Sequence, residues 1–476
     1  MTPALIPITR RVSILASALI LSSCAWWASE PAQPIHLRVI AFNDFHGNLE
    51  AGDLNLMLAD PTRPGQTLRV ATGGAAALAG LTRELRKGAP NSLVISSGDL
   101  IGATPLVSAL FRHESTVEVM NQVGVDVGTV GNHEFDAGLS ELRRVMGGGC
   151  APNQSDDPVR SCALQPYAGM RFPLVVANVR DAQNAPILPP YRIVQAGPVK
   201  VGIIGAVTRT TPQMVVPSGV AGLRFTDEAE AINAAALELE RQGVRTLIAT
   251  IHEGGEIGQP GAGADWNDPT CPGFRGDLVD IVRRLTPKVG LVLTAHTHQG
   301  YNCTLQGRHI MQAVSYGRGL SVADLRLDPS TGAIRPELTQ ARNLPVLNER
   351  TDAAHRQALI RGEPDAYAQA LQAARPDADI QAQVGRYAQA AAPLAQRVVG
   401  RVSEGLDRAG FGDTSAGRFI AQAQWEATRA PERGGSQFAL MNPGGVRTDL
   451  PCRKAPACEV TYGDLFSMQP FGNSLV

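Results

Sequence analysis

The sequence predicts an α/β fold followed by a smaller unit, and three observations support this prediction. Short apolar segments rich in Val, Ile and Leu alternate with amphipathic helical segments over residues 37–345. Polar clusters directly follow several of the apolar segments. From residue 351 the composition shifts to Ala, Gln and Arg, and residues 399–476 show a different mixture of patterns. We therefore expect a layered α/β domain with its chemistry at one edge, a helical connector and a partial α+β unit.

The elements of the first unit are predicted from periodicity. Helices are expected over 73–87, from Pro105 into the 110s and over 228–242, where small and apolar side chains recur on one helix face. The expected strands are residues 37–42, 92–97, 125–130, 174–179, 199–207, 245–251 and 289–294.

The later part of the chain is predicted to be helical first and mixed afterwards. Residues 346–398 form the helical connector, with breaks near Gly362–Pro364 and at Pro376. Within residues 399–476 we expect a helix at 415–427, a strand at 437–441 and turns at 442–445 and 472–473.

Length and charge limit the classes of function. The chain has 476 residues, with 43 basic and 44 acidic ones. This length suggests two or three domains. The near-zero net charge gives no broad basic surface, so we expect no nucleic-acid polymer as a partner, and no protein partner is evident.

Residues 1–24 have the pattern of a lipoprotein signal peptide. Arg10 and Arg11 precede the apolar run 12–21, which is too short to span a bilayer. Leu21-Ser22-Ser23-Cys24 resembles a bacterial lipobox, which predicts a lipid anchor on Cys24 and a tether over 25–36. Ala25 favours the outer membrane, facing the periplasm or the cell surface. Ordinary cleaved secretion into the periplasm is the alternative, and both the Sec and the twin-arginine routes stay open.

Six further cysteines lie in three close pairs along the chain. An even number in an exported protein favours disulfides over metal thiolates. Spacing alone suggests the pairs Cys150–Cys162, Cys271–Cys303 and Cys452–Cys458.

The polar residues that follow five of the predicted strands are typical metal ligands. They are Asp44, His46, Asp99, Asn132, His252, His296 and His298. Oxygen and imidazole ligands without cysteine suit Mn, Zn, Co or Mg. Seven ligands exceed the needs of one ion, and a carboxylate can bridge two, so we expect two divalent metal ions with Asp99 as the bridge. Asn178 and four other histidines are expected to be structural: His36, His113, His309 and His355.

The turn at residues 131–136 also carries candidates for catalysis. His133 can carry a proton, and Asp136, three residues later, can hold its imidazole in one tautomer. We therefore predict His133 and Asp136 as catalytic residues. For Glu134 the expected role is a structural hydrogen bond.

Five ordered motifs together resemble the calcineurin-like metallophosphoesterases, and more narrowly the bacterial 5′-nucleotidase and UDP-sugar hydrolase branch. They are Asp44-Phe45-His46, Gly98-Asp99, Gly131-Asn132-His133-Glu134, His252 and His296-Thr297-His298. This resemblance implies a four-layer αββα-type metallophosphoesterase domain over 37–345, and a C-terminal substrate-binding domain that is only partly present.

The resemblance also implies which residues hold which ion. One ion would be held by Asp44, His46, Asp99 and His298, and the other by Asp99, Asn132, His252 and His296. Members of this branch often have Gln at the position of His298. The implied reaction is hydrolysis of a phosphate ester in which His133 stabilises the developing charge or protonates the leaving oxygen.

The resemblance assigns substrate binding to the last unit. Asn442-Pro443-Gly444-Gly445-Val446-Arg447 resembles the family's Asn-x-Gly-Gly-x-Arg loop, and Pro470-Phe471-Gly472-Asn473 resembles its base-stacking turn. The implied contacts are Asn442, Gly444, Gly445, Arg447, Phe471 and Asn473. The chain departs from the pattern in two places. The sequence stops at Val476, before the family's second stacking aromatic and its acidic ribose contact, and Gly412 stands where relatives often have Arg, with Arg418 as a possible substitute.

We therefore expect an exported 5′-nucleotidase that releases phosphate from nucleoside 5′-monophosphates. The alternatives within the same chemistry are a UDP-sugar pyrophosphatase and a 2′,3′-cyclic-nucleotide phosphodiesterase. A catalytically silent, lipid-anchored binding protein is the alternative from another class, and the complete ligand set and the His133–Asp136 pair argue against it.

Overall fold

Two six-stranded sheets form the centre of the computed structural model, which describes residues 1, 33–155, 158–258, 265–408, 413–453 and 457–471. The expected signal peptide, the anchor at Cys24 and most of the tether lie outside the described residues. Gly412 and Asn473 also lie outside them.

The first sheet has four parallel strands with an antiparallel pair at one side. Its register sets Ile40 opposite Val94 and Ile95 opposite Val127. In spatial order its strands are β16 (Gln340–Pro345), β15 (Gly319–Leu327), β1 (Ile35–Phe42), β4 (Ser92–Ser96), β5 (Val127–Thr129) and β6 (Leu174–Val175).

The second sheet also has four parallel strands, with one antiparallel strand at each edge. In spatial order its strands are β13 (Gly300–Leu305), β14 (Arg308–Ala313), β12 (Val289–Thr294), β11 (Thr246–His252), β9 (Val199–Val207) and β8 (Tyr191–Ala196).

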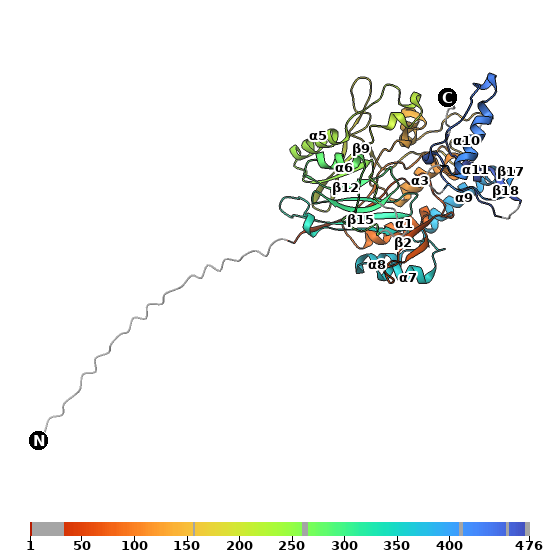
Figure 1. Cartoon of the computed structure of the whole chain (residues 1–476). Helices are drawn as coiled ribbons and strands as arrows, with labels where there is room; N and C mark the ends of the chain where they lie inside the picture. The colour runs from red at the N-terminus through yellow and green to blue at the C-terminus, as the bar shows by residue number, and fades with distance from the viewer. Residues whose placement is uncertain (2–32, 156–157, 259–264, 409–412, 454–456, 472–476) are drawn as a thin grey trace. The chain divides into compact units, whose positions relative to one another are not determined.

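The sheets stack face to face, and helices cover both outer faces. Apolar side chains from both sheets, such as Val39, Ile95, Ile203 and Leu291, form one buried cluster between them. Burial on both faces explains why these strands read as continuous apolar runs. Helices α1 (Ala75–Lys87) and α3 (Glu114–Val123) cover the first sheet, while α5 (Glu228–Arg241) and α6 (Asp277–Arg284) cover the second (Figure 1). The predicted four-layer αββα arrangement is confirmed.

The connector consists of three helices, α7 (Ala353–Arg361), α8 (Asp365–Ala373) and α9 (Ala378–Ala395). The helices stop at the two predicted breaks. Helices α8 and α9 pack against α1, and Tyr367, Leu371 and Ile380 belong to the same buried cluster as the helices of the first sheet. The connector is therefore part of the fold's core.

The C-terminal unit contains β17 (Val398–Val402), β18 (Cys458–Thr461), α10 (Ser415–Thr428) and α11 (Tyr462–Met468). The expected strand at 437–441 was wrong. This segment pairs with no strand in the described part of the chain, and Phe438 and Leu440 are 73% and 84% exposed. Alternating apolar residues form a strand only where a neighbour supplies the ladder, and among the described strands β17 and β18 pair with each other.

The remaining elements are short. The expected strand at 174–179 is divided because Asn178 exchanges hydrogen bonds with the backbone of Val207, a structural role as predicted. The short strands and helices are β2 (Asn55–Ala59), β3 (Thr67–Ala71), β7 (Val179–Arg180), β10 (Arg224–Phe225), α2 (Leu106–Ala109) and α4 (Gly138–Gly147). The single turns of 3₁₀ helix are η1 (His133–Phe135), η2 (Thr211–Gln213), η3 (Pro217–Val220), η4 (Pro336–Leu338), η5 (Pro431–Arg433) and η6 (Pro443–Gly445).

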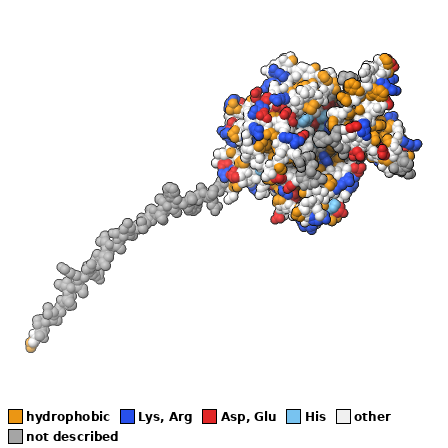
Figure 2. All heavy atoms as spheres, viewed as in Figure 1, with side chains coloured by type: hydrophobic (Ala, Val, Ile, Leu, Met, Phe, Trp, Pro, Cys, Tyr) orange, Lys and Arg blue, Asp and Glu red, His pale blue; other side chains and the backbone are white. Residues whose placement is uncertain are grey.

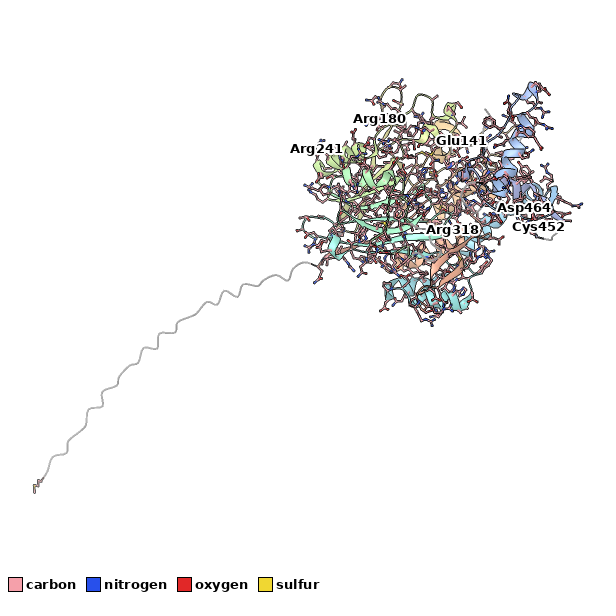
Figure 3. The ribbon with its side chains drawn as sticks, viewed as in Figure 1. Glu141, Arg180, Arg241, Arg318, Cys452 and Asp464 are labelled. Carbon is pink, nitrogen blue, oxygen red and sulfur yellow. A yellow bond between two sulfur atoms is a disulfide. The ribbon has the colours of Figure 1, made fainter. Side chains whose placement is uncertain are left out.

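All three disulfides predicted from spacing are present: Cys150–Cys162, Cys271–Cys303 and Cys452–Cys458 (Figure 3 labels Cys452). Across the described ranges, every helix is too short or too polar to span a bilayer.

Candidate metal centre

The seven predicted ligands meet where parallel strands of both sheets end, and most of them are buried. Because parallel strands end at the same side, the residues after them converge. Asp44 and His46 follow β1, Asp99 follows β4 and Asn132 follows β5. In the second sheet His252 ends β11, and His296 and His298 follow β12. The structure therefore brings together every predicted ligand.

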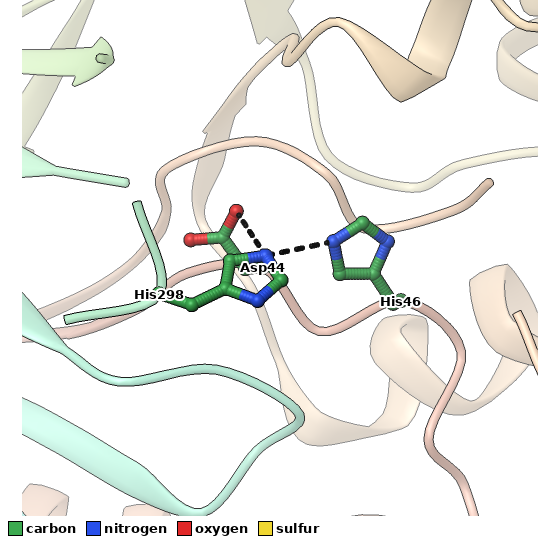
Figure 4. Close-up of side chains that lie close together, drawn as sticks. All are labelled: Asp44, His46 and His298. Carbon is green, nitrogen blue, oxygen red and sulfur yellow. Dashed lines mark hydrogen bonds and ion pairs between the residues drawn. The ribbon is translucent and has the colours of Figure 1, made fainter. Parts of the chain in front are cut away.

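One group consists of Asp44, His46 and His298 (Figure 4). Nε2 of His298 lies 3.4 Å from Oδ1 of Asp44 and 3.3 Å from Nε2 of His46. Nδ1 of His46 donates to the carbonyl of Gly102 at 2.8 Å, which leaves Nε2 to face the group. One ligand atom from each residue can approach a common point.

A second group consists of Asp99, His252 and His296, with Asn132 beside it. Nε2 of His252 lies 3.1 Å from Oδ2 of Asp99 and 3.2 Å from Oδ1 of Asn132. Nδ1 of His252 donates to the carbonyl of Ser97 at 2.9 Å. Oδ2 of Asp99 is also 3.5 Å from Nε2 of His46. Asp99 thus lies between the two groups, as a bridging carboxylate requires.

The electrostatics of the site fit bound cations. Burial by itself would raise the pKa of Asp44, but His298 beside it lowers that pKa to about 2. Burial would lower the pKa of His252, whereas Asp99 and Asp44 raise it to about 10. These buried carboxylates therefore demand positive charge at this point. A divalent ion would supply that charge while His252 binds as neutral imidazole.

The backbone at the site is held in the left-handed region. Positive φ angles of 45–73° occur at five of the seven ligands: Asp44, His46, Asp99, His296 and His298. Such angles are uncommon for residues other than glycine and concentrate at functional sites. The turns after the strands thus hold the ligands in conformations that only the surrounding fold stabilises.

Glu134 links the turn after β4 to the turn after β5 by hydrogen bonds to the backbone of both. Its buried carboxylate accepts hydrogen bonds from the N–H groups of Asp99, Leu100 and Ile101 at 2.8–3.2 Å, and from Gly131. Burial and the nearby Asp99 raise its pKa to about 7. The expected structural role of Glu134 is confirmed.

His133 lies beside the ligands, and Asp136 orients it. Nδ1 of His133 is 2.8 Å from Oδ2 of Asp136, and its ring centroid is 5.1 Å from that of His46. Burial would lower the pKa of His133, but Asp99 and Asp136 together raise it. Its Nε2 lies 3.1 Å from Nη2 of Arg447, a residue 314 positions later in the chain. His133 is also close enough to His46 and Asp99 to share a cation with them.

A cleft of about 750 Å³ opens over the ligands. In Figure 2, histidine side chains (pale blue) are visible on the surface of the folded part of the chain. Five of the predicted substrate contacts line it: Asn442, Gly444, Gly445, Arg447 and Phe471. Asn473 lies outside the described residues. The ring of Phe471 stacks on His133 at 5.8 Å, with Arg447 5.0 Å from its centroid. In this structure one face of Phe471 is therefore already occupied by protein.

Several residues of the cleft were missed from the sequence: Gln213, Met214, Tyr316, Arg318 and Arg408. Tyr316 and Arg318 follow β14, another parallel strand of the second sheet. No strand was expected at 308–313, so these two residues did not follow a predicted strand. The four histidines expected to be structural do not line this cleft.

The donor set and the four-layer αββα fold define the class of the metallophosphoesterases. The profile of the "calcineurin-like phosphoesterase" family matches residues 37–300, and the chain therefore belongs to this family. The profile of the "5′-nucleotidase, C-terminal domain" matches residues 398–476.

Individual relatives agree with this membership. Endonuclease YhcR of Bacillus subtilis is 32% identical over 94% of this chain, and the match covers 32% of that protein. Cell wall protein Lmo0130 of Listeria monocytogenes is 28% identical, and the match covers 55% of it. The chain thus spans about a third to a half of these two relatives. A probable 5′-nucleotidase of Treponema pallidum is 27% identical, with 94% of this chain and 73% of that protein covered.

A solved structure has the same fold. The 5′-nucleotidase precursor from Thermus thermophilus superposes with a TM-score of 0.66 over 92% of this chain and 75% of that one, at 22% identity.

Proposed function

We propose that this protein is a metal-dependent phosphoester hydrolase that acts on nucleoside 5′-monophosphates. The observation that carries the proposal is the pair of ligand groups joined through Asp99, with His133 lining the cleft beside them and Asp136 in contact with His133. Two ions bridged by a carboxylate are a recurring arrangement for phosphoester hydrolysis.

Each residue would have a definite role. Asp44, His46, Asp99 and His298 would hold one ion, and Asp99, Asn132, His252 and His296 the other. When bound, the ions would neutralise the phosphoryl oxygens and lower the pKa of water. Mn, Zn, Co and Mg all suit this ligand set.

His133 would act on the leaving group. Asp136 holds Nδ1, which directs Nε2 of His133 away from Asp136 and toward Arg447. In the structure Nε2 accepts from the guanidinium of Arg447, which can only donate. A substrate oxygen between the two groups would accept from both once Nε2 is protonated, and they would stabilise negative charge that develops on the departing oxygen. Asp136 would orient the ring and stabilise its charged form.

The substrate is inferred from the C-terminal unit. Its loop at 442–447 reaches the ligand groups, and the family profile for this region is that of the 5′-nucleotidase C-terminal domain. One relative is named as a probable 5′-nucleotidase and another as an endonuclease. UDP-sugars, 2′,3′-cyclic nucleotides and an oligonucleotide are therefore the competitors to test, and a silent binding protein is the alternative without catalysis.

Export and domain boundaries belong to the same proposal. We infer a signal peptide over 1–24 with a lipid anchor at Cys24, a metallophosphoesterase domain over 37–345, a connector over 346–398 and a substrate-binding unit over 399–476. Metabolic labelling with palmitate should mark the wild-type protein and leave a Cys24→Ser variant unlabelled. Equal labelling of both would refute the anchor.

One experiment tests the activity. The protein is stripped with a chelator, reloaded separately with Mn²⁺, Zn²⁺, Co²⁺ or Mg²⁺, and assayed on AMP, UDP-glucose, 2′,3′-cyclic AMP, an oligonucleotide and p-nitrophenyl phosphate. We expect no phosphate release without metal and the highest kcat/KM on AMP. If neither AMP nor p-nitrophenyl phosphate releases phosphate with any of the four metals, the silent binding protein is favoured.

A further inference from the structure

Three arginines line the cleft without an acidic partner. They are Arg318, Arg408 and Arg447, and in the described part of the chain none of their guanidinium groups lies within 4.0 Å of a carboxylate. Many arginines elsewhere in the protein are paired, for example Arg38 with Asp324 and Arg144 with Glu114. Asp99 is the one carboxylate among the described residues that line the cleft.

Arg318 is held in place by neutral groups. Nε donates to the carbonyl of Ser315 at 3.0 Å, Nη2 to the hydroxyl of Ser315 at 2.9 Å, and Nη1 to the carbonyl of Asn55 at 3.3 Å. These bonds fix the orientation of the guanidinium but leave its charge uncompensated. A partly desolvated cation without a counter-ion is unfavourable until an anion binds.

Arg318 and Arg447 contact different residues beside the metal ligands. Arg447 contacts His133, the proposed acid beside the reacting phosphate. Arg318 lies over the ring of Tyr316 at 5.4 Å, and that ring lies 5.3 Å from His298 and 5.8 Å from His46 (Arg318 is labelled in Figure 3). One aromatic ring therefore lies between Arg318 and the metal ligands, whereas Arg447 contacts His133 directly.

Arg408 lines the same cleft as Arg318. Burial lowers the pKa of Arg318, and the charge of Arg408 lowers it further. Nε of Arg408 donates to the carbonyl of Val446 at 2.8 Å, which fixes Arg408 to the loop that carries Arg447. Two cations in one cleft whose described lining includes a single carboxylate, that of Asp99, form a place for an anion.

We propose that Arg318 is a specificity-determining residue that binds a second anionic group of the substrate, apart from the phosphate at the metal ligands. This inference rests on the phosphoester hydrolysis of the proposed function and extends its substrates from nucleoside monophosphates, which carry a single phosphate, to nucleotides with a second anionic group. Substrates with a second phosphate or a carboxylate would gain from Arg318, whereas a phosphate ester with an uncharged remainder would not.

The test compares wild type with Arg318→Gln, using the full chain loaded with Mn²⁺. ADP supplies a second phosphate, and p-nitrophenyl phosphate supplies none. We expect Arg318→Gln to lower kcat/KM for ADP about tenfold or more, mainly by a higher KM, and to change kcat/KM for p-nitrophenyl phosphate less than twofold. Arg318→Lys keeps the charge and should retain most of the ADP activity. Arg350→Gln is the matched control because Arg350 pairs with the exposed Asp53, outside the cleft.

Two results would overturn the inference: an unchanged kcat/KM for ADP, or an equal loss for both substrates. A binding measurement keeps the test independent of turnover. By calorimetry, wild type should bind inorganic pyrophosphate at least tenfold more tightly than orthophosphate, and Arg318→Gln should remove this difference. If wild type hydrolyses none of the substrates but shows this difference, the proposed function fails and the inference about Arg318 stands. If hydrolysis is normal and pyrophosphate has no advantage in wild type, the inference alone fails.

Discussion

His133 and Glu134 are neighbours in one turn, yet their side chains face different surroundings. Glu134 turns inward and accepts hydrogen bonds from four backbone N–H groups, while His133 lines the cleft. The difference follows from the 3₁₀ turn over His133–Phe135, which separates successive side chains around its axis. Glu134 therefore holds the backbone of the site in place, whereas His133 is available for its chemistry.

His133→Ala should therefore separate catalysis from metal binding. We expect kcat on AMP to fall about 100- to 10,000-fold, the usual contribution of a general acid, while both metals remain bound. Elemental analysis of the purified variant measures the metal. His355→Ala on α7 is the control and should behave like wild type. A loss of metal in proportion to activity would show that His133 is a ligand.

The turns after the strands determine the geometry of the site at the scale of the element. Gly131 follows β5 and lies directly against Asp99, in the turn that follows β4. A Cβ at this position would overlap the carboxylate of Asp99 and lie 2.6 Å from the ring of His252. Glycine is required here by close approach to other groups.

Gly131→Ala should consequently displace Asp99 or His252. A misplacement of about 1 Å costs roughly 100-fold in rate, so we expect at least that loss in kcat/KM together with weaker metal binding, measured by competition with a chelator. Gly147→Ala is the matched control, because an added Cβ there meets nothing within 4 Å. An active Gly131→Ala variant with normal metal affinity would contradict the close packing.

A buried ionic network joins strands β1 and β15 of the first sheet to helix α8. The carboxylate of Asp324 in β15 accepts hydrogen bonds from His36 and Arg38 of β1 and from Tyr367 of α8, at 2.6–2.8 Å. Burial by itself would raise the pKa of Asp324, but these three partners lower it well below the usual value.

Asp324→Asn should destabilise the fold, because Arg38 then stays buried without a counter-charge. We expect a loss of about 3–5 kcal/mol in the free energy of unfolding at pH 7 by chemical denaturation. Since the folded-state pKa is depressed, the ionised carboxylate stabilises the fold above an unfolded-state pKa of about 3.9, and this stability is lost as the pH falls further. The variant should therefore lose less stability than wild type on acidification. Asp53→Asn, at an exposed ion pair, should change stability by less than about 1 kcal/mol.

Features of this structure that depend on neighbouring residues in the sequence could be predicted, whereas features that depend on distant residues could not. Strand ends such as His252 and His296 were found because an apolar run and the polar residue after it are contiguous in sequence. The convergence of Tyr316 and Arg318 on the same cleft was missed because the strand directly before them, β14, was not predicted. The strand expected at 437–441 was wrong because strand formation depends on a partner elsewhere in the chain, which no local pattern reports. The contact between His133 and Arg447 spans 314 positions and is visible only in three dimensions.

At the scale of the whole molecule, the C-terminal unit completes the cleft. Helix α11 and the loop at 442–447 are joined by a hydrogen bond from the N–H of Arg447 to the carbonyl of Met468 at 2.9 Å. This bond places the guanidinium beside His133. The chemistry proposed for the first unit therefore depends on a residue supplied by the last one.

Arg447→Ala should lower kcat/KM on AMP about 100- to 1,000-fold, the usual cost of removing one group that stabilises transition-state charge. Steady-state kinetics with Mn²⁺ measure the effect, and the metal content should stay at the wild-type value. Arg429→Ala is the control, because Arg429 stacks on Trp425 at the end of α10, outside the cleft. If Arg447→Ala had wild-type kinetics, the C-terminal unit would not contribute through Arg447 to the reaction.

The ligands come from both sheets, with Asp44, His46, Asp99 and Asn132 from the first and His252, His296 and His298 from the second. They form a site only when the two sheets are stacked, so an ion that binds there binds the native state and not the unfolded chain. By mass action, each site at a metal concentration of 100 Kd would add about 2.7 kcal/mol to the free energy of unfolding. Metal supply would then govern how long the folded protein survives as well as how fast it works. Scarcity of the ion would shorten its lifetime.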